Sequence, residues 1–179
     1  MHKPHSSEYP QSAYFSRYIE AVDGEDVNQV LQAQMQQVIA LFENLSDQQQ
    51  QYRYAVAKWS PKQILGHLTD VERIYSYRML AIARGETKRL LAFEEDAYVK
   101  IARFDTQPLS GLVRQYHFVR LSTLQLLPTF DAGTADRSGK VMGKLVSVRA
   151  LAWLIAGHER HHLNILRDRY KFIPPVLHP

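Results

Sequence analysis

The sequence predicts an all-α protein, a four-helix bundle formed by residues 1–179 as a single domain, and three observations support this prediction. Four long segments carry apolar residues at steps of three and four, which is the period of one helix face. No segment alternates apolar and polar residues over the length of a strand. A chain of 179 residues is long enough to bury one substantial core.

The first half of the chain predicts an N-terminal segment and two helices. Residues 1–14 are polar and contain two prolines, so we expect a loose arm or a strap over the domain. The first helix opens at Glu25 or Asp26, with an apolar face of Val27, Leu31, Met35, Val38, Phe42 and Leu45. The second helix follows Ser60, an N-cap residue, has Pro61 at its first position and extends to about Arg84. Its buried face comprises Ile64, His67, Leu68, Val71, Ile74, Tyr75, Arg78 and Ile82.

The second half predicts two more helices separated by irregular segments. Residues 86–107 read as a long crossover that contains a short helix. The third helix follows Pro108 and ends before Pro128, with one side formed by Leu109, Leu112, Tyr116, Val119, Thr123 and Leu127. Residues 131–145 contain three glycines and are predicted to form a loop. The fourth helix covers residues 147–170, and Pro174, Pro175 and Pro179 predict an irregular tail.

Composition argues against several functional classes. The net charge is only +4, and lysine and arginine are scattered among acidic residues, so we expect no nucleic-acid partner. No apolar run approaches the roughly 20 residues of a membrane-spanning helix, and the N-terminus lacks the apolar region of a signal peptide. These features predict a cytoplasmic protein. The absence of cysteine excludes thiolate ligands, so any metal must be bound by histidine or carboxylate.

Histidines interrupt the apolar stripes of the second and fourth helices. His158 and His162 differ by about 40° in azimuth and about 6 Å along an ideal helix axis, so both rings can reach one ion. His161 lies about 60° from His158 in the other sense and matches the stripe less well. Helical histidine pairs without a metal are common, but His67 adds a third imidazole on a buried face. The pattern is therefore compatible both with a metal site and with a metal-free core.

The segment HERHH also matches the H-E-x-x-H pattern of zinc proteases, in which Glu159 would act as general base. That class requires a third ligand downstream. Only 17 residues follow His162, and Ile165 stands where the common continuation requires glycine. A protease is the less favoured alternative.

Three segments resemble the DinB-like superfamily, in particular its YfiT-type metal-dependent hydrolases. They are KWSPKQILGHLTDVERIYSYR, FEEDAYV and SVRALAWLIAGHERHHLNILRDRY, within a resemblance that extends from about Tyr18 to Tyr170. The resemblance implies an up-down-down-up bundle, with the long crossover between helices 2 and 3. It also implies a metal site at His67, His158 and His162. Members of the superfamily include transferases and isomerases that use bacillithiol or mycothiol. The resemblance implies no DNA binding and suggests a homodimer.

Three neutral imidazoles leave at least one coordination position open, as in catalytic sites. The predicted function is a metal-dependent enzyme that acts on a small molecule, either a hydrolase with an activated water or a transferase with a low-molecular-weight thiol. Zinc is the first choice of metal and nickel the second. The alternative is a non-catalytic, metal-bound, stress-related binding protein.

Further candidates surround the predicted metal site. Glu159 reads as a general base, as an acceptor for a ligand N–H, or as a solvated helix residue. Tyr75, Tyr116 and Arg120 are candidates for the substrate pocket, with Arg120 binding an anionic group, although aromatic residues at helical spacing are usually core.

The acidic and aromatic patch of the crossover supplies two more candidates. Asp96 and Tyr98 are predicted to cap the open end of the bundle, where a substrate would enter. The alternative is that this segment is a solvated turn.

Overall fold

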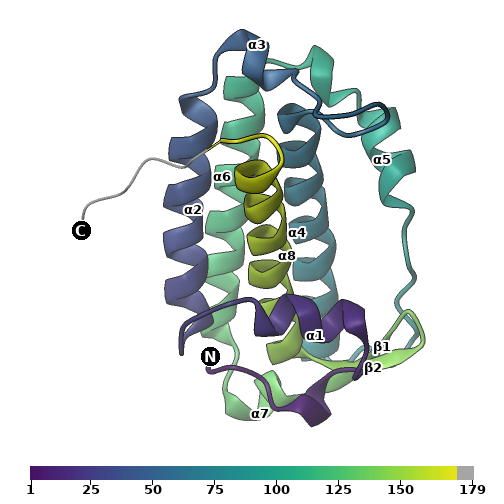
Figure 1. Ribbon diagram of the computed structural model, residues 1–179. Coiled ribbons are helices and arrows are strands. Elements are labelled where there is room, and N and C mark those ends of the chain that lie inside the picture. Colours follow the sequence, from purple (N-terminus) through teal and green to yellow (C-terminus); the bar gives the residue numbers. More distant parts are fainter. Residues whose placement is uncertain (173–179) are drawn as a thin grey trace.

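The computed structural model describes residues 1–172, which contain four long helices (Figure 1). Their bounds are α2 (Val27–Glu43), α4 (Pro61–Ala83), α6 (Leu109–Leu126) and α8 (Val148–Asp168). Helices α2 and α4 each pack against both α6 and α8, so the four form a bundle, and its buried apolar residues divide into two core clusters. The predicted four-helix bundle is therefore confirmed. The tail predicted at Pro174, Pro175 and Pro179 lies outside the described residues.

Side-chain caps define where the long helices begin. The Ser60 hydroxyl accepts a hydrogen bond from the Gln63 amide at 3.2 Å, and the Gln63 side chain accepts one from the Ser60 amide at 3.0 Å. Pro61 occupies the first position of α4, as the sequence predicts. The side chains of Asp26 and Ser147 cap α2 and α8 by accepting hydrogen bonds from backbone N–H groups of the first turn. These caps fix the start of the two helices, α4 and α8, that carry the predicted histidines.

Helix α1 (Ala13–Glu20) packs across α8 (Figure 1) and was not predicted from the sequence. Its buried residues are Phe15, Tyr18 and Ile19. The close approach depends on Gly157, because a Cβ at this position would lie 2.1 Å from the carbonyl oxygen of Tyr18. With only eight residues, α1 is too short to show a clear period in the sequence.

The N-terminal residues are attached to the bundle. The amino group of Met1 lies 2.7 Å from Asp26 Oδ2, and the Trp153 indole N–H donates to the His2 carbonyl at 2.9 Å. A short 3₁₀ helix (Ser6–Glu8) follows. Residues 1–14 were predicted to form either a loose arm or a strap over the domain. These contacts show a strap, so the loose arm is incorrect.

Residues 131–145 are more ordered than the predicted loop. They contain α7 (Ala132–Asp136) and most of an antiparallel hairpin of β1 (Ser138–Val141) and β2 (Lys144–Ser147). Val141 pairs with Lys144, and the two turn residues, Met142 and Gly143, both have positive φ values of 52° and 82°. This is the backbone of a two-residue hairpin turn. Strands of four residues are too short to give the alternation that would have predicted them.

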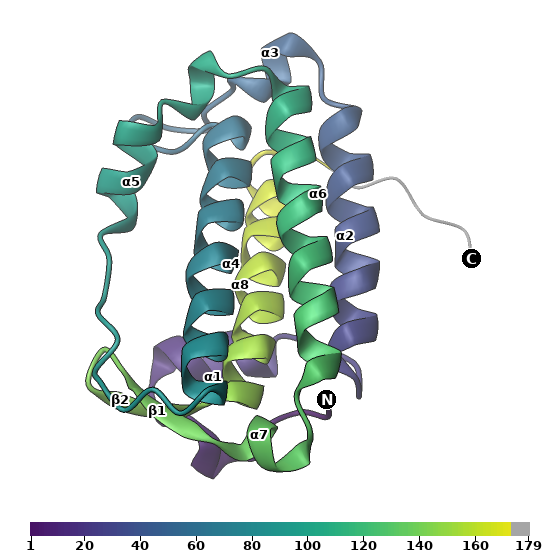
Figure 2. The same cartoon turned by 180° about the vertical axis from the view of Figure 1, so that it is seen from behind.

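The crossover between α4 and α6 lies along one side of the bundle (Figure 2). It contains the predicted short helix, α5 (Glu95–Ala102), and a 3₁₀ turn (Phe104–Thr106). The Phe104 ring lies so close to α4 that a Cβ at Gly66 would approach it to 2.4 Å. Another short helix, α3 (Asp47–Gln50), precedes α4, and a 3₁₀ turn (Leu127–Thr129) follows α6. The docked crossover places α5 beside the histidine-bearing part of α4.

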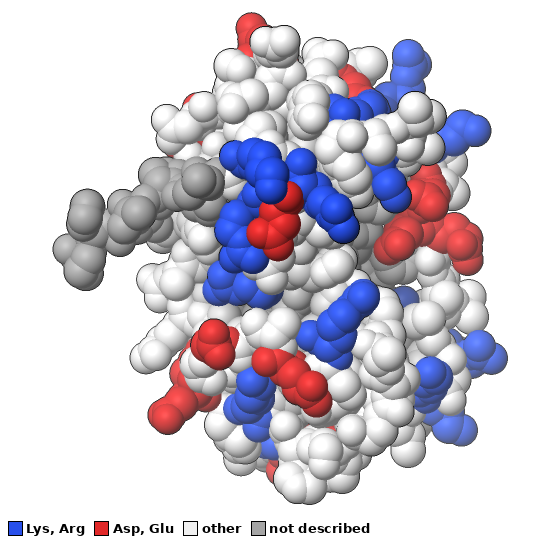
Figure 3. All heavy atoms as spheres, in the orientation of Figure 1, with Lys and Arg blue, Asp and Glu red and all other residues white. Residues whose placement is uncertain are grey.

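The surface carries both signs of charge. Figure 3 shows lysine and arginine side chains interspersed with acidic ones on this face, and acidic atoms gather beside the start of α5. Among the described helices, none combines the length and apolar character needed to cross a bilayer.

Candidate metal centre

Three buried histidines from two helices converge at one point. His67 Nε2, on α4, lies 3.0 Å from His158 Nε2, on α8. His162 Nε2, one turn further along α8, lies 3.2 Å from the same His158 atom. Three nitrogens bound to one zinc ion at about 2.0–2.1 Å would lie roughly 3.3 Å apart. The spacing and chemistry of this donor set therefore fit a divalent ion.

Aromatic rings hold the imidazoles in place. The Trp59 indole lies 4.6 Å from the His67 ring, centroid to centroid, and 6.3 Å from the nearly parallel His162 ring. Tyr18 of α1 contacts His158 edge-on at 5.7 Å. Trp59 and Tyr18 therefore restrict the orientations of the three imidazole rings. Trp59 directly precedes the Ser60 cap, so the local structure that starts α4 also positions this indole.

Burial keeps the three imidazoles neutral. Desolvation lowers the pKa of His67 to about 4, and it lowers the pKa values of His158 and His162 well below the ordinary value. The neighbouring imidazoles add to the effect at His158 and His162, because two adjacent rings resist carrying like charges. At neutral pH the rings therefore retain the lone pairs that a metal requires.

Glu95 is the acidic side chain that the structure places beside the cluster. Its Oε2 atom lies 4.0 Å from His67 Nε2. Partial burial raises the pKa of Glu95, and the nearby carboxylates of Asp96 and Glu94 raise it further. This acidic patch was evident in the sequence, but the residues predicted for the site were Asp96 and Tyr98. The phase of α5 relative to α4, which decides which acid faces His67, cannot be read from an eight-residue helix.

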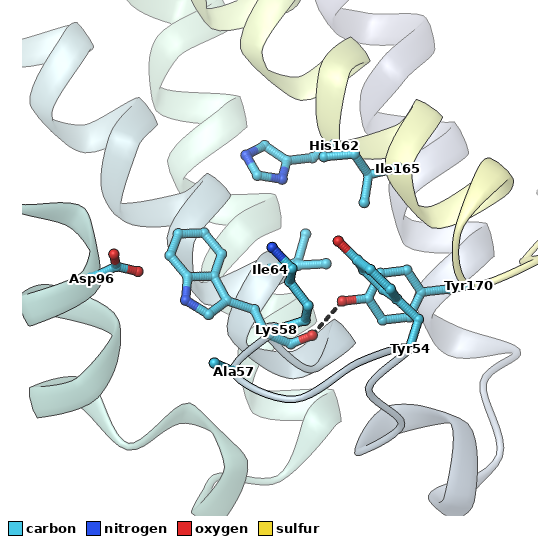
Figure 4. Close-up of a pocket in the computed structure, with 9 residues that line it drawn as sticks. Tyr54, Ala57, Lys58, Ile64, Asp96, His162, Ile165 and Tyr170 are labelled. Atoms are coloured by element: carbon cyan, nitrogen blue, oxygen red, sulfur yellow. Dashed lines mark hydrogen bonds between the residues drawn. The ribbon is translucent and has the colours of Figure 1, made fainter.

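A pocket of about 270 Å³ opens beside His162 (Figure 4). It is lined by Tyr54, Ala57, Lys58, Trp59, Ile64, Asp96, His162, Ile165 and Tyr170. Asp96 is one of the residues that line this pocket. Tyr98 does not line it, because its half-exposed ring packs on Phe93 at 5.2 Å in a separate depression.

Arg120, Tyr116 and Glu159 form a closed network in the core. Arg120 donates to both oxygens of Glu72 and, at 2.7 Å, to Glu159 Oε2. The Tyr116 hydroxyl donates to the same Glu159 oxygen at 2.9 Å, and Arg120 also donates to the Leu31 carbonyl. The anionic partners of Arg120 are therefore residues of the chain itself. Neither Arg120 nor Tyr116 lines the pocket beside His162, and both pocket predictions were wrong.

Glu159 has a structural role in this arrangement. Both of its oxygens face Arg120, and the side chain is buried among groups that satisfy it. The prediction of Glu159 as a general base is incorrect, because its oxygens are committed to Arg120 and Tyr116. The protease alternative loses its base for the same reason.

Tyr75 and His161, two other residues considered for the site, lie outside it. Tyr75 is buried, and its hydroxyl lies 2.9 Å from that of Tyr14, between α4 and α1. Burial raises the pKa of Tyr75, and the residue does not line the pocket beside His162. His161 contacts Tyr18 at 5.4 Å and lies outside the cluster, as its weaker match to the stripe predicted.

Comparisons with known proteins agree with this architecture. The family model described as the DinB superfamily matches residues 30–166, which include all three clustered histidines. A search of curated proteins finds no match. A similar solved structure is that of YfiT from Bacillus subtilis, described as a probable metal-dependent hydrolase with an unusual four-helix bundle topology. The identity is 19%, the match covers 96% of this chain and 94% of that one, and the TM-score is 0.69. The chain belongs to the DinB superfamily.

Proposed function

We propose that this protein is a metal-dependent hydrolase in which His67, His158 and His162 bind one divalent ion. The observation that carries the proposal is the convergence of three buried imidazole nitrogens next to an open pocket. Zinc is the first choice and nickel the second, because both suit a site made only of imidazoles. The description of YfiT as a probable metal-dependent hydrolase supports the same class.

A divalent ion held by neutral ligands lowers the pKa of a bound water or thiol toward neutrality. The residues around the site supply the remaining functions. Trp59 covers the His67 and His162 rings and limits water access to that face. Glu95 is positioned to accept a proton from the nucleophile, and its raised pKa brings this carboxylate closer to the operating pH of a general base.

We further infer that the helices run up-down-down-up, with the long crossover between α4 and α6. The positions of the connections support this order. In Figure 1, α3 joins α2 to α4 at one end of the bundle, and the hairpin precedes α8 at the other. This order makes α4 and α8 antiparallel neighbours, which allows His67 to meet the two histidines of α8.

Glu95→Gln is expected to lower kcat by at least about 100-fold, because the amide cannot accept the proton. Metal content should stay at the wild-type level. The substrate for this assay is first identified by screening esters, amides and pairs of a thiol with an electrophile. A parallel screen with a chelator shows which activities depend on the metal. Glu94→Gln, which changes the neighbouring carboxylate, is the matched control and should retain most of the activity.

The same variant tests the second candidate function, a non-catalytic metal-bound binding protein. That alternative is favoured by the 4.0 Å distance between Glu95 and His67, because a fourth protein ligand would close the site. If Glu95 is a ligand, Glu95→Gln loses metal and the apo protein loses stability. Retained metal with lost turnover supports the hydrolase, whereas lost metal and a blank substrate screen support the binding protein.

A further inference from the structure

His162 has one ring nitrogen that its surroundings do not satisfy. Its Nε2 atom belongs to the histidine cluster, whereas Nδ1 is buried and has no hydrogen-bond partner among the described residues. A histidine that binds metal through one nitrogen carries a proton on the other and usually donates it to a carboxylate, a carbonyl or water. The His162 ring points into the pocket beside it (Figure 4). Because Nδ1 has almost no exposed surface, a ligand in that pocket supplies the missing acceptor once the neighbouring side chains move aside.

Two further hydrogen-bond donors extend into the same space. The Lys58 side chain and the Tyr54 hydroxyl both point toward the His162 side of the pocket (Figure 4). Among residues 1–172, Lys58 forms no ion pair with a carboxylate of the chain. An ammonium, a phenol and an imidazole thus border one pocket, whereas the Tyr170 hydroxyl beside them donates to the Trp59 carbonyl. This combination is complementary to a single anionic group.

The other residues that line the pocket limit the size and the charge of the ligand. Ile64 and Ile165 provide apolar walls, and the volume of about 270 Å³ lies just below the usual range of about 300–1,000 Å³ for ligand pockets. Asp96 lies on the opposite side of the pocket from Lys58 and Tyr54 (Figure 4). A second negative charge on the ligand would approach this carboxylate. The pocket therefore favours a small monoanion with an apolar body.

We propose that the pocket binds a small monocarboxylate, whose carboxylate accepts hydrogen bonds from His162 Nδ1–H, Lys58 and Tyr54. A carboxylate fits three donors better than a phosphate dianion, whose three oxygens and greater charge require more of them. The inference rests on the proposed function because metal binding at Nε2 places the proton on Nδ1. It names the class of substrate, with the reactive bond of the molecule extending toward the metal centre.

The test is calorimetric titration of zinc-loaded protein with phenylacetate and, separately, with its neutral analogue phenylacetamide. Lys58→Met keeps the length of the side chain and removes the charge. It is expected to weaken phenylacetate binding roughly tenfold or more and to leave phenylacetamide binding unchanged. Lys58→Arg should restore most of the affinity. Lys140→Met, on the exposed face of β1 at the other end of the bundle, is the control for loss of one positive charge.

Three outcomes would overturn the assignment. They are equal binding of acid and amide, unchanged phenylacetate binding by Lys58→Met, and no binding of phenylacetate at millimolar concentration. The second outcome would mean that the carboxylate binds only to the metal. Repeating the titration after chelation separates this inference from the proposed function. Lys58-dependent binding to the metal-free protein supports the carboxylate subsite even where the chain proves to lack hydrolase activity.

Discussion

His67→Ala is expected to lower the zinc content of the purified protein from about one ion per chain to near background. His67 is the contribution of α4 to the cluster, and its Nε2 lies 3.0 Å from His158 Nε2. Without it, two histidines of α8 remain, and two neutral ligands on one helix bind zinc far more weakly than three that the fold holds in place. The measurement is elemental analysis after zinc loading and removal of free metal. His158→Ala and His162→Ala should give the same loss.

The controls for this result are already present in the chain. His161 neighbours His162 but lies outside the cluster, so His161→Ala should keep its zinc. Helical circular dichroism confirms that each variant is folded, because a metal lost through unfolding would say nothing about ligation. Full zinc retention by a folded His67→Ala protein would contradict the ligand assignment.

Arg120→Met is expected to lower the free energy of unfolding by about 3–5 kcal/mol. The guanidinium is fully buried and pairs with Glu72 and Glu159, so its removal leaves two buried carboxylates with fewer donors. The Leu31 carbonyl also loses a donor. Urea denaturation followed by circular dichroism measures the change. The expected loss is large because the partners cannot regain hydration without opening the bundle.

Matched variants separate this effect from a simple loss of charge. Arg73→Met removes an exposed arginine of α4 that pairs with Asp70 at 3.0 Å, and its effect should stay below about 1 kcal/mol. Adding Glu72→Gln and Glu159→Gln to Arg120→Met should recover part of the loss, because the uncompensated charges are then gone. Equal stability of the Arg120 and Arg73 variants would exclude a structural role for the network.

The long helices were predictable because each buries one continuous stripe. Val148, Leu151, Ile155, His158 and His162 follow the helical period, so the sequence alone placed two imidazoles on the buried face of α8. His67 followed from the same argument on α4. Whether the histidines of α4 and α8 lie at the same level of the bundle depends on how the two helices pack. That they do was implied only by the family resemblance.

The functions of the charged residues were not predictable from one helix at a time. Glu159 and Arg120 are 39 positions apart and belong to α8 and α6, so their pairing appears only once these helices are packed. Glu159 was assigned to the site because of the H-E-x-x-H pattern, and Arg120 because a guanidinium can bind an anionic group. In this protein the function of the pair is to neutralise buried charge inside the bundle. Glu95 was missed because the phase of a single two-turn helix is not specified locally.

The most direct test of the metal centre is the X-ray absorption spectrum of the zinc-loaded wild-type protein, recorded at the zinc edge. Three imidazole nitrogens at about 2.0 Å, together with one or two further light-atom ligands, are the predicted first shell. The absence of cysteine excludes thiolate sulfur of the chain from this shell. A spectrum without multiple imidazole scattering, or a protein that retains no zinc, would contradict the assignment of His67, His158 and His162 as ligands.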